Sequence, residues 1–309
     1  MTAPADLPPS EDGLGGPRPA LPEETVRALT EVSAFGPYFA VSTGEPAAED
    51  GGAADMHDRD PAEDGSAAAT HGRSPVADAD TAPGHGSGWR PLGDLAADTA
   101  LLRARIADHG RRLGTGEERV AASILYQGLA ARLWSPVVGM AAAAGLVPAT
   151  AGDLRWRPAA TGPLPLWSPP TARWLAVPGG AARQAEAVYR VVMGEVLEPL
   201  AAAVGRLTAI APALLRGNAS AALAGVLKTV PPALGGRSAQ LVRELLAIGA
   251  LDGTGELAEP APGAYFFVRR SCCLYYRVPG GGLCEDCALL PQKDRDLAWA
   301  RASGREGAR

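Results

Sequence analysis

The chain has 309 residues, a formal net charge of -5 and a hydrophobic fraction of 47%, which is enough apolar material for a sizeable core. It has no basic run with interleaved aromatic residues, which argues against a nucleic-acid-binding protein. Its most apolar run, residues 137–147, is far shorter than the roughly 20 residues of a membrane-spanning helix, and the N-terminus lacks the features of a signal peptide. These patterns predict a cytoplasmic protein without a transmembrane segment.

Two segments are poor in large apolar residues. Residues 1–22 are rich in proline and glycine, and in residues 44–88 acidic side chains far outnumber Arg59 and Arg73. Such segments bury too little surface to offset their chain entropy. We therefore expect a disordered tail at 1–22 and a disordered acidic insertion at about 44–88, the latter within a single domain that spans residues 23–303.

Most of the remaining chain has the apolar period of amphipathic helices. A proline and two acidic residues suit the first turn of a helix from Pro22, and residues 35–41 then read as a turn that enters a strand. The further helices are expected at residues 93–114, 116–134, 135–148, 181–207, 211–230 and 236–253.

Prolines and a serine set the expected helix boundaries. Ser135 as N-cap and Pro136 at the first helical position predict that a new helix begins there, and Pro199 predicts a kink. Residues 263–273 read as a strand that leads into the cysteines. The expected fold class is therefore mainly α with a few short β-strands (α+β): a helical body followed by a C-terminal cysteine-rich segment at about 264–291.

All four cysteines lie within residues 271–287, in the pattern C-C-x10-C-x2-C. A reducing compartment keeps such cysteines as thiols. Four thiolates are the ligand set of an all-cysteine zinc site or of an iron–sulfur cluster, and redox-active thiols or a vicinal disulfide are the remaining alternatives. The candidate ligands are Cys272, Cys273, Cys284 and Cys287.

The adjacent pair Cys272 and Cys273 favours a cluster of two irons. Neighbouring residues of an extended chain point to opposite sides, so binding one ion with both requires a bent backbone. Two irons spread the ligand positions and relax this demand. A Rieske centre needs two histidines, and only His109 lies outside the acidic segment. The glycines at 280–282 allow the chain to fold back towards the sulfurs.

Three arginines flank the cysteines, namely Arg269, Arg270 and Arg277. Beside an anionic cluster they would stabilise the reduced form and raise the reduction potential. The alternative is that they are exposed side chains of a strand and a loop.

The stretch "VRRSCCLYYRVPGGGLCEDC" resembles the FhuF family of ferric-siderophore reductases, which are 2Fe-2S proteins of iron acquisition. Two other segments, "FGPYFAV" at 35–41 and "GNASAALAG" at 217–225, resemble family segments, although Arg216 stands where the family often has an aromatic residue. The resemblance implies that Cys272, Cys273, Cys284 and Cys287 hold a 2Fe-2S cluster. It leaves open which pair binds which iron, and it implies no catalytic residue beyond the cluster.

The same resemblance implies an oxidoreductase that passes one electron to a ferric siderophore and so releases Fe(II) in the cytoplasm. Hard oxygen ligands hold ferric iron more tightly than ferrous iron. The chain has no dinucleotide-binding fingerprint, so a separate ferredoxin or flavoprotein is the expected electron donor. Peripheral association with an uptake system is compatible with this interpretation. A surface with Trp156, Trp167 and Trp174 is one hypothetical siderophore site, and the alternative, commoner for tryptophans in a loop, is that they pack over the core.

Two alternatives stay open at this point. One is a helical binding module that structural zinc stabilises, and the other is an iron or redox sensor without reductase activity.

Overall fold

The computed structural model describes residues 15–44, 88–159 and 162–302. Its helices are α1 (Pro22–Ser33), η1 (Leu92–Ala96), α2 (Thr99–Arg112), α3 (Glu118–Ala144), η2 (Ala151–Asp153), α4 (Gly180–Val188), η3 (Tyr189–Leu197), α5 (Glu198–Thr208), α6 (Pro212–Gly225), η4 (Val226–Lys228), α7 (Pro232–Leu246), η5 (Gly249–Leu251), η6 (Tyr275–Arg277) and α8 (Gln292–Ala302). Its strands are β1 (Arg18–Pro19), β2 (Arg90–Pro91), β3 (Leu146–Pro148), β4 (Arg155–Trp156), β5 (Leu166–Trp167), β6 (Trp174–Ala176), β7 (Gly255–Ala261) and β8 (Ala264–Arg269).

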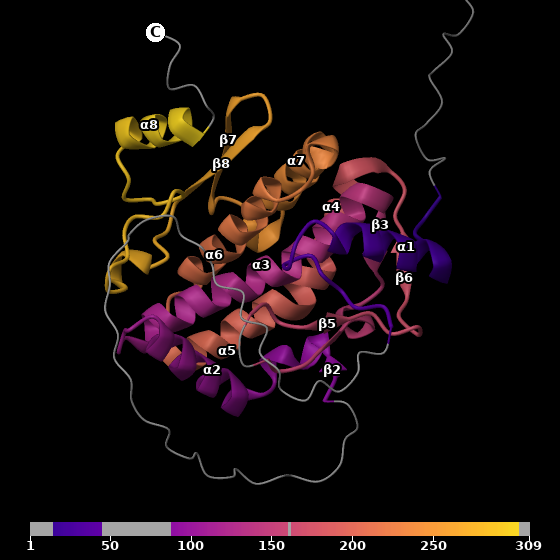
Figure 1. Cartoon of the computed structure of the whole chain (residues 1–309), viewed down its shortest axis with the longest axis horizontal. Helices are drawn as coiled ribbons and strands as arrows, with labels where there is room; N and C mark the ends of the chain where they lie inside the picture. Colours follow the sequence, from indigo (N-terminus) through magenta and orange to yellow (C-terminus); the bar gives the residue numbers. More distant parts are fainter. Residues whose placement is uncertain (1–14, 45–87, 160–161, 303–309) are drawn as a thin grey trace, which may run out of the picture.

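The described residues confirm the predicted fold class, because helices dominate and the strands are short and antiparallel (Figure 1). The strands form three small sheets, in the orders β1-β6-β3, β2-β4-β5 and β7-β8. Strand β1 corrects the expected boundary of the N-terminal tail, since Arg18 and Pro19 pair with Ala176 and Leu175. The expected acidic insertion lies outside the described residues, apart from Gly44 and Gly88.

Helix α3 is the centre of the apolar core and contacts α1, α2, α6 and α7 (Figure 1). Its Trp134 is fully buried, and the indole N–H donates to the carbonyl of Ala219 on α6 at 3.1 Å. A buried tryptophan whose N–H is satisfied contributes its whole ring to the core. The α3–α6 pair thus forms a rigid base against which the C-terminal segment packs.

The expected helix boundary at Ser135 is wrong, because α3 runs without a break from Glu118 to Ala144 through Pro136. A proline inside a helix removes one backbone hydrogen bond. The Ser135 hydroxyl donates to the carbonyl of Ala131 at 2.7 Å, so it bonds within the helix rather than capping a new one. Burial of residues 133–142 on all sides outweighs the local cost of the proline.

The expected irregularity near Pro199 takes the form of a π-helical stretch, η3, which joins α4 to α5. Pro199 lies in the first turn of α5, where its missing N–H costs little. Wider turns of this kind occur mostly as short insertions in α-helices. The segment 180–208 is therefore one interrupted helical rod.

The three tryptophans considered for a binding surface follow the alternative interpretation and pack against the core. Trp156 and Trp174 are fully buried, and Trp167 is half-buried against Trp89, with 5.7 Å between the ring centroids. Trp167 also forms a parallel bridge with Ser42. The two flanks of the segment 45–87 therefore meet at one residue of β5.

Residues 255–302 form a hairpin of β7 and β8 followed by α8. Strand β8 lies at the position predicted from its apolar residues, whereas β7 and α8 are elements that the sequence patterns did not indicate. Helix α8 packs on the hairpin through a stacked pair, Phe266 and Trp299, with 5.0 Å between centroids. It thereby closes over the end of the cysteine segment.

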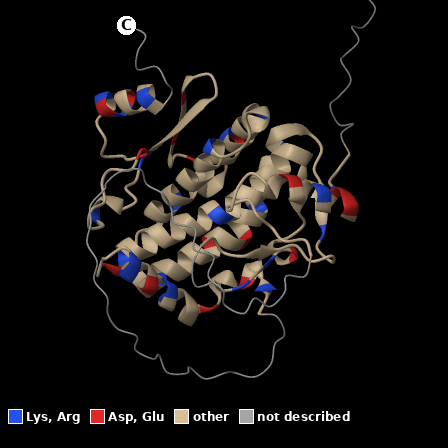
Figure 2. Cartoon of the chain, in the orientation of Figure 1, with Lys and Arg blue, Asp and Glu red and all other residues tan. Residues whose placement is uncertain are grey.

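In the described residues no helix is both long and apolar enough to cross a membrane. Basic and acidic side chains are interspersed on α1, α2 and α8, whereas much of α3 carries no charge (Figure 2). The uncharged helices are those of the core.

Candidate metal centre

The cysteines follow directly on β8, which delivers them to the end of the α3–α6 pair. Strand β8 ends at Arg269, whose backbone N–H donates to the carbonyl of Asp286 at 3.1 Å, so the return stretch of the loop pairs with the strand end. Gly281 makes the fold-back possible, since a Cβ there would lie 2.6 Å from the carbonyl of Tyr275. The close approach at Gly281 is to backbone carbonyls, and an approach of the glycines at 280–282 to the sulfurs stays a prediction.

The sulfurs of Cys273 and Cys284 are in contact at 3.7 Å. Two thiolates on one tetrahedral metal ion, with bonds of about 2.3 Å, lie about 3.8 Å apart. The pair thus has the spacing of two ligands on the same metal ion. No group of three or more His, Cys, Asp or Glu side chains in the described part of the chain converges on one ion, so Cys272 and Cys287 do not complete a single closed site.

Backbone N–H groups are aimed at the sulfurs. The N–H of Leu274 donates to the sulfur of Cys272, and that of Leu289 to the sulfur of Cys287, each at 3.4 Å. Leu274 adopts a left-handed conformation (φ 69°), which turns the backbone directly after the adjacent cysteines. Hydrogen bonds to cysteine sulfurs stabilise thiolates and raise the reduction potential of a bound cluster.

The contact between Cys273 and Cys284 shifts the pKa values of the two thiols in opposite directions. A hydrogen bond from Cys284 is the main cause that lowers the pKa of Cys273 to about 6, with help from the Tyr275 N–H and the charge of Arg269. The same contact and burial raise the pKa of Cys284. The first proton of the pair therefore leaves easily and the second one with difficulty, which a bound metal ion would overcome.

Arg269 is a buried cation beside these thiols. Its side chain is 0% exposed, and Nη1 donates to Oδ1 of Asn218 at 2.6 Å. Nε lies 3.9 Å from the carboxylate of Asp286, and neither Nε nor Nη2 has a hydrogen-bond partner among the described residues. The positive charge lowers the pKa of Cys273 and opposes the burial that raises the pKa of Cys272. A buried cation with free donors suits an anionic neighbour.

A chain of buried hydrogen bonds connects this arginine to the cysteine backbone. The amide nitrogen of Asn218 donates to both the carbonyl and the hydroxyl of Ser123, at 2.9 and 2.8 Å. The Ser123 hydroxyl in turn donates to the carbonyl of Cys273 at 2.6 Å. Gly217 lies so close to Ser271 that an added Cβ would collide with the Ser271 hydroxyl. The Gly217–Asn218 segment singled out in the sequence thus positions the cysteines.

The other flanking arginines face outwards. Arg277 pairs with Glu117 at 2.9 Å, and Arg270 is exposed and donates to the carbonyl of Gly253. Of the three flanking arginines only Arg269 therefore acts on the thiols from inside.

Two buried residues that support the site escaped the sequence analysis. Ser123 interrupts an apolar helix face, and Arg295 on α8 donates to the carbonyl of Cys287 at 3.0 Å. The signal that could have identified Ser123 is a polar residue among apolar helix positions. Nothing in the pattern of α8 pointed to Arg295.

A groove of about 580 Å³ opens beside the cysteine pair, between α3 and α6. Cys273 and Cys284 line one end of it, together with Tyr275 and Asp286. A small molecule at this end of the groove would lie next to the sulfurs.

These features define a class: a mainly helical protein with four thiols and a buried guanidinium at the end of its central helix pair. Residues 269–289, which hold all four cysteines, match the family model of the FhuF 2Fe-2S C-terminal domain. The match confirms the resemblance indicated by the cysteine spacing. No curated protein matches the chain.

The residues present fit a 2Fe-2S cluster. Four thiols are the required donor set, the contact between Cys273 and Cys284 has the spacing of two ligands on one iron, and the unpartnered N–H groups of Arg269 suit a cluster that is anionic once thiolates bind it. Burial of Cys273 and Cys287 keeps water from these two thiols.

Proposed function

We propose that the protein is a ferric-siderophore reductase of the cytoplasm. Cys272, Cys273, Cys284 and Cys287 are the proposed ligands of its 2Fe-2S cluster, and a ferredoxin or flavoprotein is the proposed electron donor. When bound, the cluster would supply single electrons at a potential that the protein sets. The observation that carries the proposal is the buried Arg269 beside four clustered thiols in a segment that matches the FhuF 2Fe-2S family model.

The chain's own residues have three tasks in this function. Arg269, held by Asn218, offsets the additional negative charge that accompanies reduction. The backbone of Leu274 and Leu289 donates to sulfur, which favours the same state. The ferric chelate is the substrate: one electron from the donor converts Fe(III) to Fe(II), whose weaker hold on hard oxygen ligands allows release.

The first test is anaerobic purification with metal and sulfide analysis, followed by visible and EPR spectra before and after dithionite. We expect a red-brown protein with about two irons and two sulfides per chain and a rhombic EPR signal on reduction. The reduced protein is then mixed with ferric siderophores, and Fe(II) is trapped with a ferrous chelator. A colourless protein that contains zinc would contradict the proposal and leave the binding-module alternative. A cluster that reduces no ferric siderophore would favour the sensor alternative.

A further inference from the structure

We infer that the groove between α3 and α6 is the docking site of the ferric siderophore, and that His109 and Gln127 are polar contacts for its ligand shell. This inference rests on the proposed function, since it names the place where that substrate would bind. The siderophore is the inferred occupant because the groove ends at the cysteine pair, the source of the electron.

The shape of the groove follows from small residues on both helices. On α3 the lining residues run from Ile124 to Ser135 along one face, over about 16 Å. Gly128 faces open space, as does Gly225 at the end of α6, because a Cβ at either position would meet nothing within 4 Å. The hollow exists because side chains are missing there, and a substituent at either glycine would fill it.

Two polar atoms at the groove lack partners. Nε2 of His109 and Oε1 of Gln127 are buried and have no hydrogen-bond partner among the described residues. Burial, aided by Arg112, lowers the pKa of His109, so its ring is neutral near pH 7 and offers one donor and one acceptor. Unpaired buried polar atoms are costly, and a turn of either side chain towards the groove would bring its unpaired atom to a ligand with oxygen and amide groups.

The outer wall of the groove is the segment at 35–41 that resembles a family motif. Tyr38 lines the groove and is 42% exposed. The buried side chain of Arg132 holds this wall, donating to the carbonyls of Tyr38 and Ala40 at 2.7 and 2.5 Å. Both segments outside the cysteines that resemble the family thus border the site. The segment at 217–225 supports Cys273 through Asn218, and the segment at 35–41 closes the groove.

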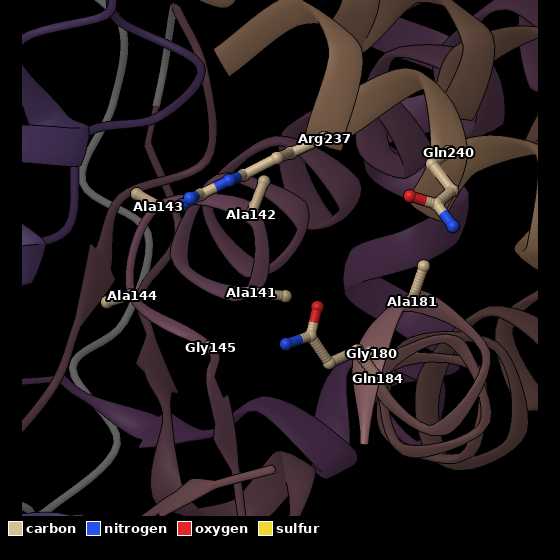
Figure 3. A pocket seen from close by; sticks show the side chains of 10 residues that line it. All are labelled: Ala141, Ala142, Ala143, Ala144, Gly145, Gly180, Ala181, Gln184, Arg237 and Gln240. Atoms are coloured by element: carbon tan, nitrogen blue, oxygen red, sulfur yellow. The ribbon is translucent and has the colours of Figure 1, made fainter. Parts of the chain in front are cut away.

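A second cavity, of about 420 Å³, is a weaker candidate. It lies at the other end of α3, near Ala141, where Arg237, Gln184 and Gln240 surround it (Figure 3). From Ser123, which contacts the cysteine segment, to Ala141 is about 27 Å along the helix axis. A chelate bound there would be remote from the thiols.

The experiment blocks the groove without touching the cysteines. The probes are the gallium(III) complexes of desferrioxamine B and enterobactin, because gallium(III) mimics ferric iron and is not reduced by the protein. The complex whose ferric form is reduced faster is titrated into the cluster-loaded protein by calorimetry. The blocking variants are Gly128→Leu and Gly225→Leu, and Gln127→Leu removes one polar contact. Gly236→Leu is the matched control, because Gly236 is a helix glycine with open space on the exposed side of α7.

We expect at least a tenfold rise in Kd for each blocking variant and about tenfold for Gln127→Leu, with unchanged visible spectra. Gly236→Leu should stay within twofold of the unsubstituted chain. Equal affinity in all variants, with reductase activity intact, would overturn the docking site and leave the proposed function standing. Absence of reduction of any ferric siderophore by the cluster-loaded protein would overturn the proposed function and the docking site together. Should Gly128→Leu lose its cluster, Gly225→Leu, on the opposite wall, carries the same test.

Discussion

At the scale of single residues, the contact between Cys273 and Cys284 and the buried charge of Arg269 decide what the site does. The sulfur contact indicates how the four thiols would divide between two irons. The buried charge of Arg269 affects how readily a bound cluster accepts an electron, since a cation stabilises the more negative state.

The sulfur contact predicts that Cys273 and Cys284 bind one iron, and that Cys272 and Cys287 bind the other. In the reduced cluster the added electron resides mainly on one iron, so a serine ligand has a different effect on each iron. Reconstituted Cys273→Ser and Cys284→Ser should therefore share one EPR pattern, and Cys272→Ser and Cys287→Ser another. Ser271→Ala is the control for the cysteine loop. If the spectrum of Cys273→Ser pairs with that of Cys272→Ser, the division is wrong.

Removal of the buried charge should make the cluster harder to reduce. We expect Arg269→Gln to lower the midpoint potential by tens of millivolts, where about 59 mV corresponds to a tenfold change for one electron. Asn218→Asp should act in the same direction, because its carboxylate would neutralise the guanidinium in place. Redox titration followed by EPR measures both.

Arg270→Gln is the matched control for this series, since it removes the same charge from an exposed neighbour. Its potential should change by much less than that of Arg269→Gln. Equal potentials in all three variants would show that Arg269 is merely structural.

At the scale of elements, α3 carries the site at one end and a glycine cap at the other. Gly145 follows the helix with φ 68°, and its N–H donates to the carbonyl of Ala141 at 3.0 Å. Gly128 lies inside the same helix with an ordinary helical φ and open space around it. Gly145 is therefore suited to its left-handed backbone conformation, whereas Gly128 is suited to the open space beside the helix.

We predict opposite signs for the same substitution on this helix. Gly145→Ala should lower the free energy of unfolding by about 1 kcal/mol, because alanine is strained in the left-handed conformation. Gly128→Ala should raise it by up to about 1 kcal/mol through helix propensity. Chemical denaturation followed by circular dichroism measures both. Changes of the same sign in the free energy of unfolding would contradict the left-handed conformation of Gly145 or the helical conformation of Gly128.

At the scale of the whole molecule, the cysteine segment depends on contacts from α3, α6, β8 and α8. The flanks of the segment 45–87 converge elsewhere, at β5. Ser42 exchanges backbone hydrogen bonds with its neighbours there, from its N–H to the carbonyl of Leu166 at 3.0 Å and from the Ser168 N–H to its own carbonyl at 2.9 Å.

This separation predicts that replacing residues 46–86 with a short glycine–serine linker leaves the cluster intact. The ends of the linker would be held by Ser42 and Trp89, which both contact Trp167. Iron content and the visible spectrum of the shortened protein check the prediction. Loss of the cluster in a protein that keeps its helical circular dichroism would show that the removed segment supports the site.

The sequence alone determined the helical class, the strand before the cysteines and the four thiols, because apolar period, β-formers and ligand spacing are local properties of the chain. It placed a helix start at Ser135, which was wrong because burial in the core overrode the local signal, and it left open whether the tryptophans at 156–174 line a surface or pack over the core. Only the tertiary structure brought Ser123, Asn218 and Arg269 together behind Cys273. These residues are far apart along the chain, and their meeting depends on how α3, α6 and β8 pack, which no local pattern encodes.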